Sequence, residues 1–296
     1  MKPTARLSTG MAGGTTVVAI GAYDAFSARI VEKAGFDAVY VGSYATEAAT
    51  LGKPDLALMS KTDRLAIARN IVKAVDIPVI VDAEEGYGNA ISVMDTVRDF
   101  EDTGAAGIHL DDEALPSKCP FLPGIPQNEL ISTDEMCGKV EAAARAKTDP
   151  DFKVIVRSDV IGTVPREVYY REKRIEEVVR RSRAYAGAGA DAIFVMALTD
   201  EEVDHFAREI DAPLVGIFAT AEPLPIASFE RAGYPLVIGS LVGIYAAGKG
   251  LLRAMRKLAA TRDWNAIQDE MIDDAEFFDI VDVERYRSYY EDFRIR

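Results

Sequence analysis

Short runs of β-branched and other apolar residues alternate along the chain with longer stretches in which apolar residues recur at helical spacing. A weak repeat combines the end of an amphipathic helix, a glycine and such a run, and its four copies span 32–41, 101–110, 186–195 and 230–239. The glycine is typical of a helix C-terminus, where the backbone needs a positive φ. Three further runs carry a proline or an aspartate at their start, at 77–82, 151–157 and 212–218. With the run at 17–20, the pattern predicts eight buried strands and about seven helices between them.

Continuous apolar strands that alternate with helices are typical of a parallel sheet covered by helices. Eight such units, without a Gly-x-Gly-x-x-Gly opening, predict an α/β fold of the closed (β/α)₈ TIM barrel type. An open, doubly wound sheet remains the alternative, because one strand is easily miscounted. No linker divides the chain, and we therefore expect a single barrel domain over residues 1–296.

Two segments fall outside the repeating pattern. One is a proline-rich insert over about 114–128. The other is an acidic and aromatic C-terminal run over 271–296, which belongs to a helical extension expected from about residue 265. This extension either packs on the outside of its own barrel or docks on a partner subunit, and the pattern favours neither.

The charge balance of the chain narrows the choice of partners. Its 34 lysines and arginines and 48 aspartates and glutamates give a net charge of −14, and such a surface repels nucleic-acid backbones and anionic lipid heads. We therefore expect neither a nucleic-acid nor a membrane partner. Two cysteines cannot build a disulfide framework, and the sequence shows neither a signal-peptide pattern nor an apolar run of about 18 residues. The expected location is the cytoplasm.

Catalytic groups in a (β/α)₈ barrel lie where the strands end and the following loops begin. Acidic residues follow three predicted strands: Asp55 follows the second, Asp82 and Glu84 the third, and Asp111 the fourth. Asp82 and Glu84 are two residues apart and would point the same way along a regular strand. Carboxylates that converge in one mouth repel one another unless a hard cation such as Mg²⁺ or Mn²⁺ lies among them. Arg157, after the fifth strand, offers a forked donor to a substrate carboxylate or phosphate. Alternatively, these residues only end strands and cap helices.

The two cysteines and two histidines differ in their surroundings. Cys119 lies in the proline-rich insert beside Lys118, where a lowered pKa would suit a proton donor or a nucleophile. Cys137 lies in a helical pattern, and we expect it to be a packing residue. His109 falls inside a strand and His205 inside a helix, and both are expected to be structural.

Five stretches of the sequence resemble the phosphoenolpyruvate mutase/isocitrate lyase superfamily, and the likeness covers most of the chain. They are 21–28, 51–55, 82–90, 111–116 and 156–159. The resemblance implies a (β/α)₈ barrel that assembles as a homotetramer, a dimer of dimers whose subunits exchange their eighth helix. It also implies an enzyme that binds Mg²⁺ and makes or breaks C–C or P–C bonds beside a carboxylate, through an enolate that the metal stabilises.

The resemblance further assigns roles around the metal. Asp82 matches the direct metal ligand of the family. Three further carboxylates match those that hold metal-bound waters, namely Asp55, Glu84 and Asp111.

Other positions match the groups that bind and transform the substrate. Ser43, Tyr44 and Ala45 match the backbone segment that receives the 2-oxo acid end. Arg157 matches the partner of the substrate carboxylate and is also a catalytic candidate. Tyr23, within the matched stretch 21–28, is a further catalytic candidate.

The insert at 114–128 corresponds to the gating loop of the family. In the lyase branch this loop carries Lys-Lys/Arg-Cys-Gly-His, and its cysteine protonates the departing enolate. The chain retains the cysteine as Cys119, whereas Pro120 and Phe121 replace the glycine and the histidine.

Other departures lie around the distal part of the substrate. The lyases have a glutamate after strand six, where this chain has Met196, and Asn-x-x-Glu-Gly-Gly after strand seven, where it has 217–222. Tyr44 replaces a glycine. Because Met196, Ile217 and Thr220 stand where polar groups bind tricarboxylates, we expect an apolar wall and a smaller or more apolar substrate.

The leading hypothesis is therefore a Mg²⁺-dependent carbon–carbon lyase, with Mn²⁺ as the alternative metal. Its substrate would be a small carboxylate, a substituted 2-hydroxy diacid of the methylisocitrate or dimethylmalate type, cleaved to a 2-oxo acid. One alternative is decarboxylation or hydrolysis of an oxaloacetate-like 2-oxo acid. Another is a barrel that binds a metabolite without catalysis.

Overall fold

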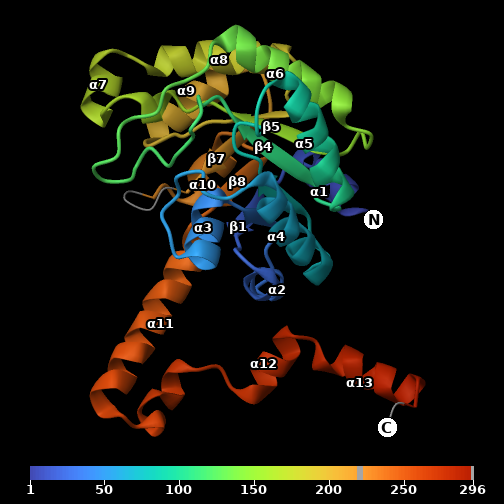
Figure 1. Cartoon of the computed structure of the whole chain (residues 1–296). Helices are drawn as coiled ribbons and strands as arrows, with labels where there is room; N and C mark the ends of the chain where they lie inside the picture. The colour runs from blue at the N-terminus through green and yellow to red at the C-terminus, as the bar shows by residue number, and fades with distance from the viewer. Residues whose placement is uncertain (219–222, 295–296) are drawn as a thin grey trace.

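Eight parallel strands close into a barrel in chain order, which confirms the (β/α)₈ prediction (Figure 1). The computed structural model describes residues 1–218 and 223–294. The strands are β1 (Val17–Gly21), β2 (Ala38–Val41), β3 (Val79–Asp82), β4 (Gly107–Asp111), β5 (Lys153–Arg157), β6 (Ala192–Phe194), β7 (Leu214–Ile217) and β8 (Leu236–Gly239).

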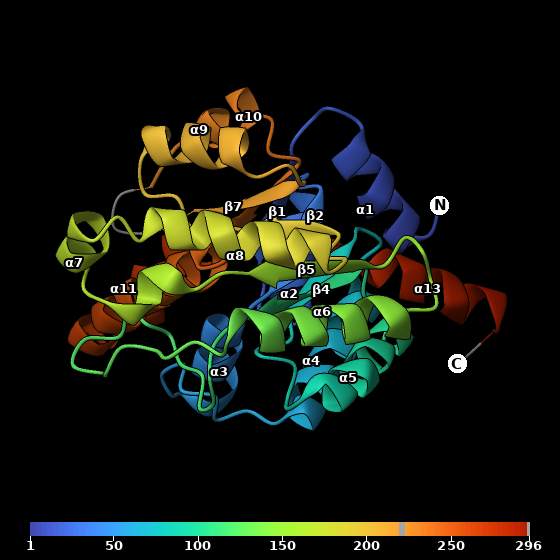
Figure 2. The same ribbon diagram turned by 90° about the horizontal axis from the view of Figure 1, so that it is seen from above.

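Helices surround the barrel, and Figure 2 shows α5, α6 and α8 side by side on its outer side. The α-helices are α1 (Pro3–Ala12), α2 (Ala25–Lys33), α3 (Ser43–Leu51), α4 (Lys61–Ala74), α5 (Ala90–Asp102), α6 (Thr133–Ala146), α7 (Arg166–Arg171), α8 (Ile175–Gly187), α9 (Asp200–Glu209), α10 (Ile226–Arg231), α11 (Val242–Thr261), α12 (Asp274–Ile280) and α13 (Val283–Asp292). The described residues also include the 3₁₀ segments η1 (Val160–Thr163) and η2 (Trp264–Glu270). Among the described residues, none of the helices combines the length and apolar character needed to cross a bilayer.

The glycines of the sequence repeat have the backbone conformation that the repeat predicts. Gly35, Gly104, Gly189 and Gly233 have φ values of 86°, 87°, 106° and 79°. A side chain at these angles would be strained, and each glycine therefore turns the chain from a helix end into the next strand. The recurring pattern is thus the αβ connection of the barrel.

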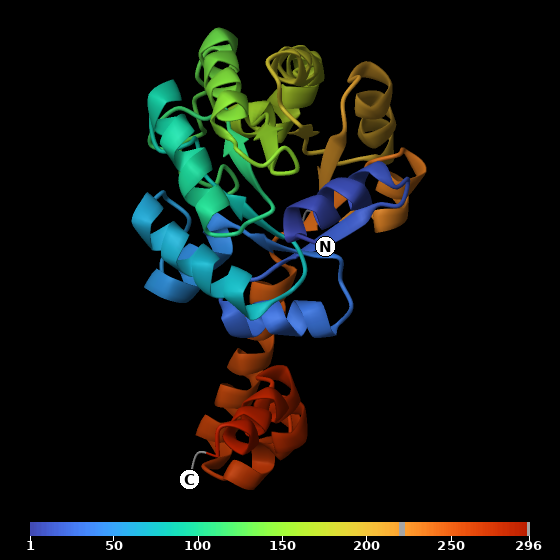
Figure 3. The same ribbon diagram turned by 90° about the vertical axis from the view of Figure 1, so that its right-hand side faces the viewer.

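The two ends of the barrel differ. At the amino ends of the strands, α1 packs across the opening and buries Leu7 among inward-facing side chains such as Val17 and Leu236 (Figure 3). At the carboxyl ends, the register places Asp82 beside His109 and Asp111 beside Arg157. The end covered by α1 is therefore packed with apolar side chains, whereas polar residues gather at the carboxyl ends of the strands.

The C-terminal helices α11, α12 and α13 form an arm that extends from the barrel and contacts it again at α2. Helix α11 leaves the barrel as a rod of about 30 Å, and Ala254 is its one buried residue in the described chain. Helix α12 returns to its own barrel at α2, where the rings of Phe26 and Phe277 lie 5.8 Å apart and Lys33 pairs with Asp279 at 2.7 Å. Many apolar side chains of this arm remain exposed, including Leu251, Leu252, Met255, Trp264 and Tyr286.

Candidate active site

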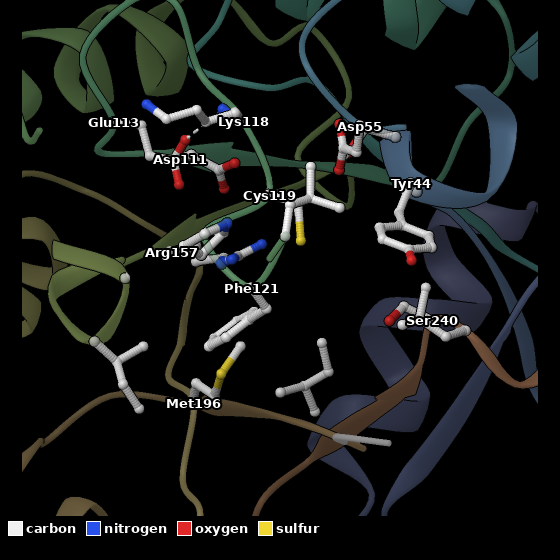
Figure 4. Close-up of a pocket in the computed structure, with 18 of the residues that line it drawn as sticks. Tyr44, Asp55, Asp111, Glu113, Lys118, Cys119, Phe121, Arg157, Met196 and Ser240 are labelled. Atoms are coloured by element: carbon white, nitrogen blue, oxygen red, sulfur yellow. Dashed lines mark hydrogen bonds between the residues drawn. The ribbon is translucent and has the colours of Figure 1, made fainter. Parts of the chain in front are cut away.

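A cavity of about 630 Å³ lies at the carboxyl ends of the strands (Figure 4). Most residues that the sequence singled out line it: Ser43, Tyr44, Asp55, Asp82, Glu84, Asp111, Cys119 and Arg157. Two other candidates, Ala45 and Tyr23, are not among the described residues that line the cavity. Ala45 is buried within α3, and Tyr23 precedes α2, where its backbone N–H donates to Ser27 Oγ. Tyr23 is therefore not among the residues that line the cavity with the other candidates.

Ser43 joins two of the carboxylates at the start of α3. Its Oγ lies 3.0 Å from Asp82 Oδ2 and 3.0 Å from Asp55 Oδ2, and its backbone N–H donates to Asp82 Oδ2 over 3.1 Å. Because this N–H is one of the unpaired donors at a helix N-terminus, it favours an anion at this position. Ser43, at the start of α3, thus holds the Asp82 carboxylate by two hydrogen bonds.

Asp82 remains ionised although it is buried. Burial alone would raise the pKa of Asp82, but His109, Arg64 and backbone N–H donors lower it to about 2. Its other oxygen, Oδ1, accepts from the backbone N–H of Glu84 over 3.0 Å. The site therefore keeps one fixed negative charge at the end of β3.

Glu84 reaches the cavity by a route that differs from the prediction. Strand β3 ends at Asp82, and Glu84 has a φ of +52°, so the two side chains are not successive members of one strand face. Glu84 instead occupies a tight turn, and its Oε1 accepts from Arg64 Nη2 over 2.8 Å. The regular-strand argument was wrong, although both carboxylates line the cavity.

The other three candidate metal-site carboxyl groups, Asp55, Glu84 and Asp111, have raised pKa values because too little positive charge lies near them. Burial, followed by the charge of Asp82, raises the pKa of Asp55 to about 7 and raises the pKa of Glu84 well above its usual range. Burial likewise raises the pKa of Asp111. Carboxyl groups that resist ionisation in this way would each be stabilised as anions by a cation among them.

The donor atoms of this region fit a hard divalent cation. Two groups each bring three ligand atoms within 4.8 Å of one another: Asp82, His109 and Asp111 form one, and Glu47, Asp55 and Glu84 the other. Apart from the imidazole, these are the oxygen ligands that Mg²⁺ and Mn²⁺ prefer. The residues present therefore fit such an ion.

Arg157 is held in the cavity with part of its donor capacity unused. Its Nη2 donates to Asp159 Oδ1 over 2.5 Å, and its guanidinium lies 5.3 Å from the centre of the Phe194 ring. Asp112, buried behind it, fixes the backbone N–H of Asp159 over 2.8 Å. Within the described chain, Arg157 Nε is buried without a hydrogen-bond partner.

Cys119 lies above the cavity, and Figure 4 shows its sulfur directed toward the centre. Its backbone N–H donates to the carbonyl of Asp55 over 3.1 Å. The sequence suggested a lowered pKa from the neighbouring Lys118, but burial raises the pKa of the thiol to about 11. Cys119 is therefore a protonated thiol at neutral pH, which suits a proton donor and not a resting nucleophile.

One side of the cavity is apolar. Figure 4 shows Phe121 and Met196 across the cavity from the carboxylates Asp55 and Asp111. Leu198 and Ile217 extend the same lining, as do Ile161, Val164 and Phe218. Met196 and Ile217 thus lie where the sequence expected the apolar wall. Thr220, the third expected member, lies outside the described residues.

Several buried residues that support the site were not assigned to it from the sequence. Two of them, Arg64 and Glu47, project from helices. Arg64 pairs with Glu84. Glu47 accepts hydrogen bonds from the backbone N–H groups of Leu58 (2.8 Å) and Met59, in the segment that follows Asp55. In the sequence, a charged residue at a position that faces the buried side of a helix would have indicated such a role.

Tyr40 and His109 are two more residues that the sequence did not assign to the site, and they lie inside the barrel. His109, expected to be structural, lies 3.1 Å from Tyr40 Oη through Nδ1 and 2.5 Å from Asp111 Oδ1 through Nε2. Burial lowers the pKa of His109. The signal for both residues would have been a polar group inside an otherwise apolar strand.

Comparison with known proteins identifies relatives over almost the whole chain. The model of the phosphoenolpyruvate phosphomutase family matches residues 10–259. A 2,3-dimethylmalate lyase of Eubacterium barkeri is 36% identical over 275 residues, covering 92% of this chain and 91% of that protein. A 2-methylisocitrate lyase of Aeropyrum pernix is 34% identical, covering 91% and 84%. The crystal structure of a phosphoenolpyruvate phosphomutase from Streptomyces platensis subsp. rosaceus has a TM-score of 0.88 at 30% identity, covering 98% and 99%.

Proposed function

Because the chain belongs to the phosphoenolpyruvate phosphomutase family, we propose that it is a carbon–carbon lyase that depends on a divalent cation, Mg²⁺ or Mn²⁺. Its substrate would be a 2-hydroxy diacid with alkyl substituents, and one product a 2-oxo acid such as pyruvate or glyoxylate. The observation that carries the proposal is Cys119, a protonated thiol directed into a cavity whose opposite sides are anionic and apolar. Proton donation to a carbon fragment requires such a group.

Each part of the cavity has a role in this reaction. Asp82 would hold the cation directly, and Asp55, Glu84 and Asp111 would hold it through water. When bound, the cation would supply positive charge to the oxygens of the forming 2-oxo acid. Arg157, which lines the cavity, would bind the adjacent carboxylate, and the Ser43–Ala45 segment would position the same end of the substrate.

Bond cleavage would then depend on Cys119. As the substrate hydroxyl gives its proton to an ionised carboxylate of the cavity and becomes the 2-oxo group, the bond between the hydroxyl-bearing carbon and its neighbour breaks, and the bonding electron pair passes to the departing fragment. Cys119 would deliver its thiol proton to that carbon. Because the pKa of the thiol is about 11, the group is fully protonated before the reaction, and the thiolate must be reprotonated before the next turnover.

The apolar side of the cavity supports an alkyl-substituted substrate. Methyl or ethyl groups beside the breaking bond would contact Phe121, Met196 and Ile217, and each buried methylene contributes about 0.8 kcal/mol. A third carboxylate would instead be desolvated against these side chains. Similarity to a 2,3-dimethylmalate lyase is consistent with such a substrate.

A substrate panel tests the proposal. The purified protein with Mg²⁺ is offered 2,3-dimethylmalate, 2-methylisocitrate, isocitrate and oxaloacetate, and the products are followed by proton NMR. We expect a 2-oxo acid from 2,3-dimethylmalate and little or none from the tricarboxylates isocitrate and 2-methylisocitrate. Turnover of oxaloacetate alone would establish the hydrolase or decarboxylase alternative. Absence of turnover, together with absence of Mg²⁺–oxalate binding by calorimetry, would leave a barrel without this activity.

We also propose that the chain forms a homo-oligomer, a dimer of dimers in which α11 and the following segment dock on a second copy. The exposed apolar side chains of the arm support this assembly, because monomeric proteins rarely leave so many on one extended segment. The contact between α12 and α2 shows that the arm touches its own barrel at one place as well.

A further inference from the structure

The loop over 114–128 is closed over the cavity by contacts that lie at its two ends. At its base, the backbone N–H of Ala114 donates to the carbonyl of Glu129 over 2.7 Å, and Glu113 forms a bridge with Leu130. Glu113 and Asn128 therefore stand next to each other where the loop leaves and rejoins the barrel. Both are almost fully buried, at 3% and 5% exposure.

These two side chains hold the backbone of the residue that precedes Cys119. Glu113 Oε2 accepts from the backbone N–H of Lys118 over 3.3 Å, the contact drawn as a dashed line in Figure 4. Asn128 Nδ2 donates to the carbonyl of Lys118 over 2.8 Å and also to Glu113 Oε1. Both backbone polar groups of Lys118 are thus satisfied by one buried pair of side chains.

Further contacts fix the loop on both sides of this pair. The backbone N–H of Asn128 donates to the carbonyl of Gly162 over 3.2 Å, and Pro120 packs so closely on Gly162 that a Cβ there would lie 2.7 Å from it. Cys119 itself is held by Asp55. The Glu113–Asn128 pair is therefore the side-chain link between the loop and the barrel immediately before the thiol.

We propose that Glu113 and Asn128 are positioning residues that latch the loop and hold Cys119 in the cavity. Their polar groups reach the loop backbone, and neither side chain needs to contact the substrate. Without the pair, Lys118 would lose two hydrogen bonds, and the segment that carries Cys119 would spend more time away from the cavity. The part that Cys119 plays in cleavage rests on the proposed function, but the latch itself does not.

The accessibility of the Cys119 thiol to iodoacetamide tests the latch directly, in a Cys137→Ser background so that one cysteine reports. Asn128→Ala removes both side-chain donations, and we expect Cys119 to be alkylated about tenfold faster. Asn128→Asp places a second carboxylate against Glu113 and the Lys118 carbonyl, and the increase should be at least as large. The matched control is Glu129→Ala, which changes the exposed neighbour outside the cavity lining and should leave the rate unaltered.

An exchange of donor and acceptor separates the latch from a general loss of stability. In the double variant Glu113→Gln, Asn128→Asp, the amide on residue 113 donates to the carboxylate on residue 128. We expect the alkylation rate to fall below that of Asn128→Asp without reaching the parent rate, because the carboxylate on residue 128 still faces the Lys118 carbonyl. Thermal unfolding of each variant shows whether a fast rate comes from a folded protein.

The outcomes are distinct. Unchanged alkylation in folded Asn128→Ala and Asn128→Asp would overturn the latch. If the substrate panel gives a cleaved diacid, Asn128→Ala should lower kcat more than it raises KM, because the loop carries the proton donor. If the panel gives no turnover but alkylation accelerates, the proposed function fails and the latch stands.

Discussion

Arg64 and Glu84 form an ion pair beneath the floor of the cavity, with Nη2 2.8 Å from Oε1 and side-chain exposures of 0% and 8%. Arg64 comes from α4 and Glu84 from the turn after β3, so the pair ties an outer helix to a candidate metal-site residue. The buried guanidinium needs an acceptor and the buried carboxyl needs a donor, and removal of either partner is therefore costly.

We expect Arg64→Met to destabilise the protein by about 1–3 kcal/mol, because the Glu84 carboxyl loses its buried hydrogen-bond donor, and to weaken binding of Mg²⁺ with oxalate. Burial already raises the pKa of Glu84, and the loss of the guanidinium would raise it further, which keeps the carboxyl protonated and a poor ligand. Urea unfolding measures the first effect and calorimetry the second. Arg69→Met, at an exposed position of the same helix, should change neither.

Asp82→Asn should abolish cation binding without unfolding the barrel. The amide keeps the size of the carboxylate and one oxygen that can accept from the Ser43 N–H, but it removes the ionised charge that the site maintains. We expect the joint affinity for Mg²⁺ and oxalate to fall by more than about 100-fold, beyond what the loss of an outer partner costs. Asp63→Asn, at the exposed cap of α4, is the control. Undiminished binding would remove Asp82 from the proposed ligands.

Much of the fold could be read from the sequence because the signals are local. Gly35 and Gly189 mark helix ends by a conformation that few other residues adopt, and the apolar runs after them can only be buried strands. Once the barrel is known, Asp82, Asp111 and Arg157 must meet at one end, since parallel strands end together. These three residues line one cavity, as the sequence indicated.

The rest of the site depends on contacts between distant segments. Arg64 pairs with Glu84 only because α4 packs behind β3, and nothing within α4 names that partner. Glu84 enters the cavity through a turn with positive φ, which no alternation rule describes. The pKa of Cys119 was mispredicted because its neighbour in sequence, Lys118, matters less than the burial that loop closure imposes.

Cys119→Ser should lower kcat for the true substrate by about 100- to 10,000-fold with little change in KM, because the hydroxyl fills the same space but is a far weaker acid. Steady-state kinetics on the diacid that the panel identifies measures both constants. Cys137→Ser, in α6, should retain the parent activity. Full activity in Cys119→Ser would require another proton donor.

The raised pKa of Cys119 predicts a characteristic pH profile for its alkylation. Only the thiolate reacts, and burial opposes its formation, so the rate should rise about tenfold per pH unit and level off only near pH 11. An ordinary thiol would level off about two units earlier. Iodoacetamide labelling of the Cys137→Ser protein between pH 7 and 10.5 provides the profile. A plateau below pH 9 would mean that the thiolate is stabilised, as a nucleophile requires.

The exposed arm leads to a prediction about assembly. Leu251 and Leu252 are 64% and 51% exposed on α11, and we infer that a second copy covers them. A glutamate at position 252 would have to be desolvated in that contact. We therefore expect Leu252→Glu to reduce the mass measured by light scattering to that of a smaller species. The control Leu252→Met should preserve the parent mass. Because Tyr245, on the same helix, lines the cavity and its hydroxyl lies 3.1 Å from that of Tyr44, dissociation should also lower activity. A parent protein that is already monomeric, with α11 solvated, would contradict the assembly but leave the chemistry of the barrel untouched.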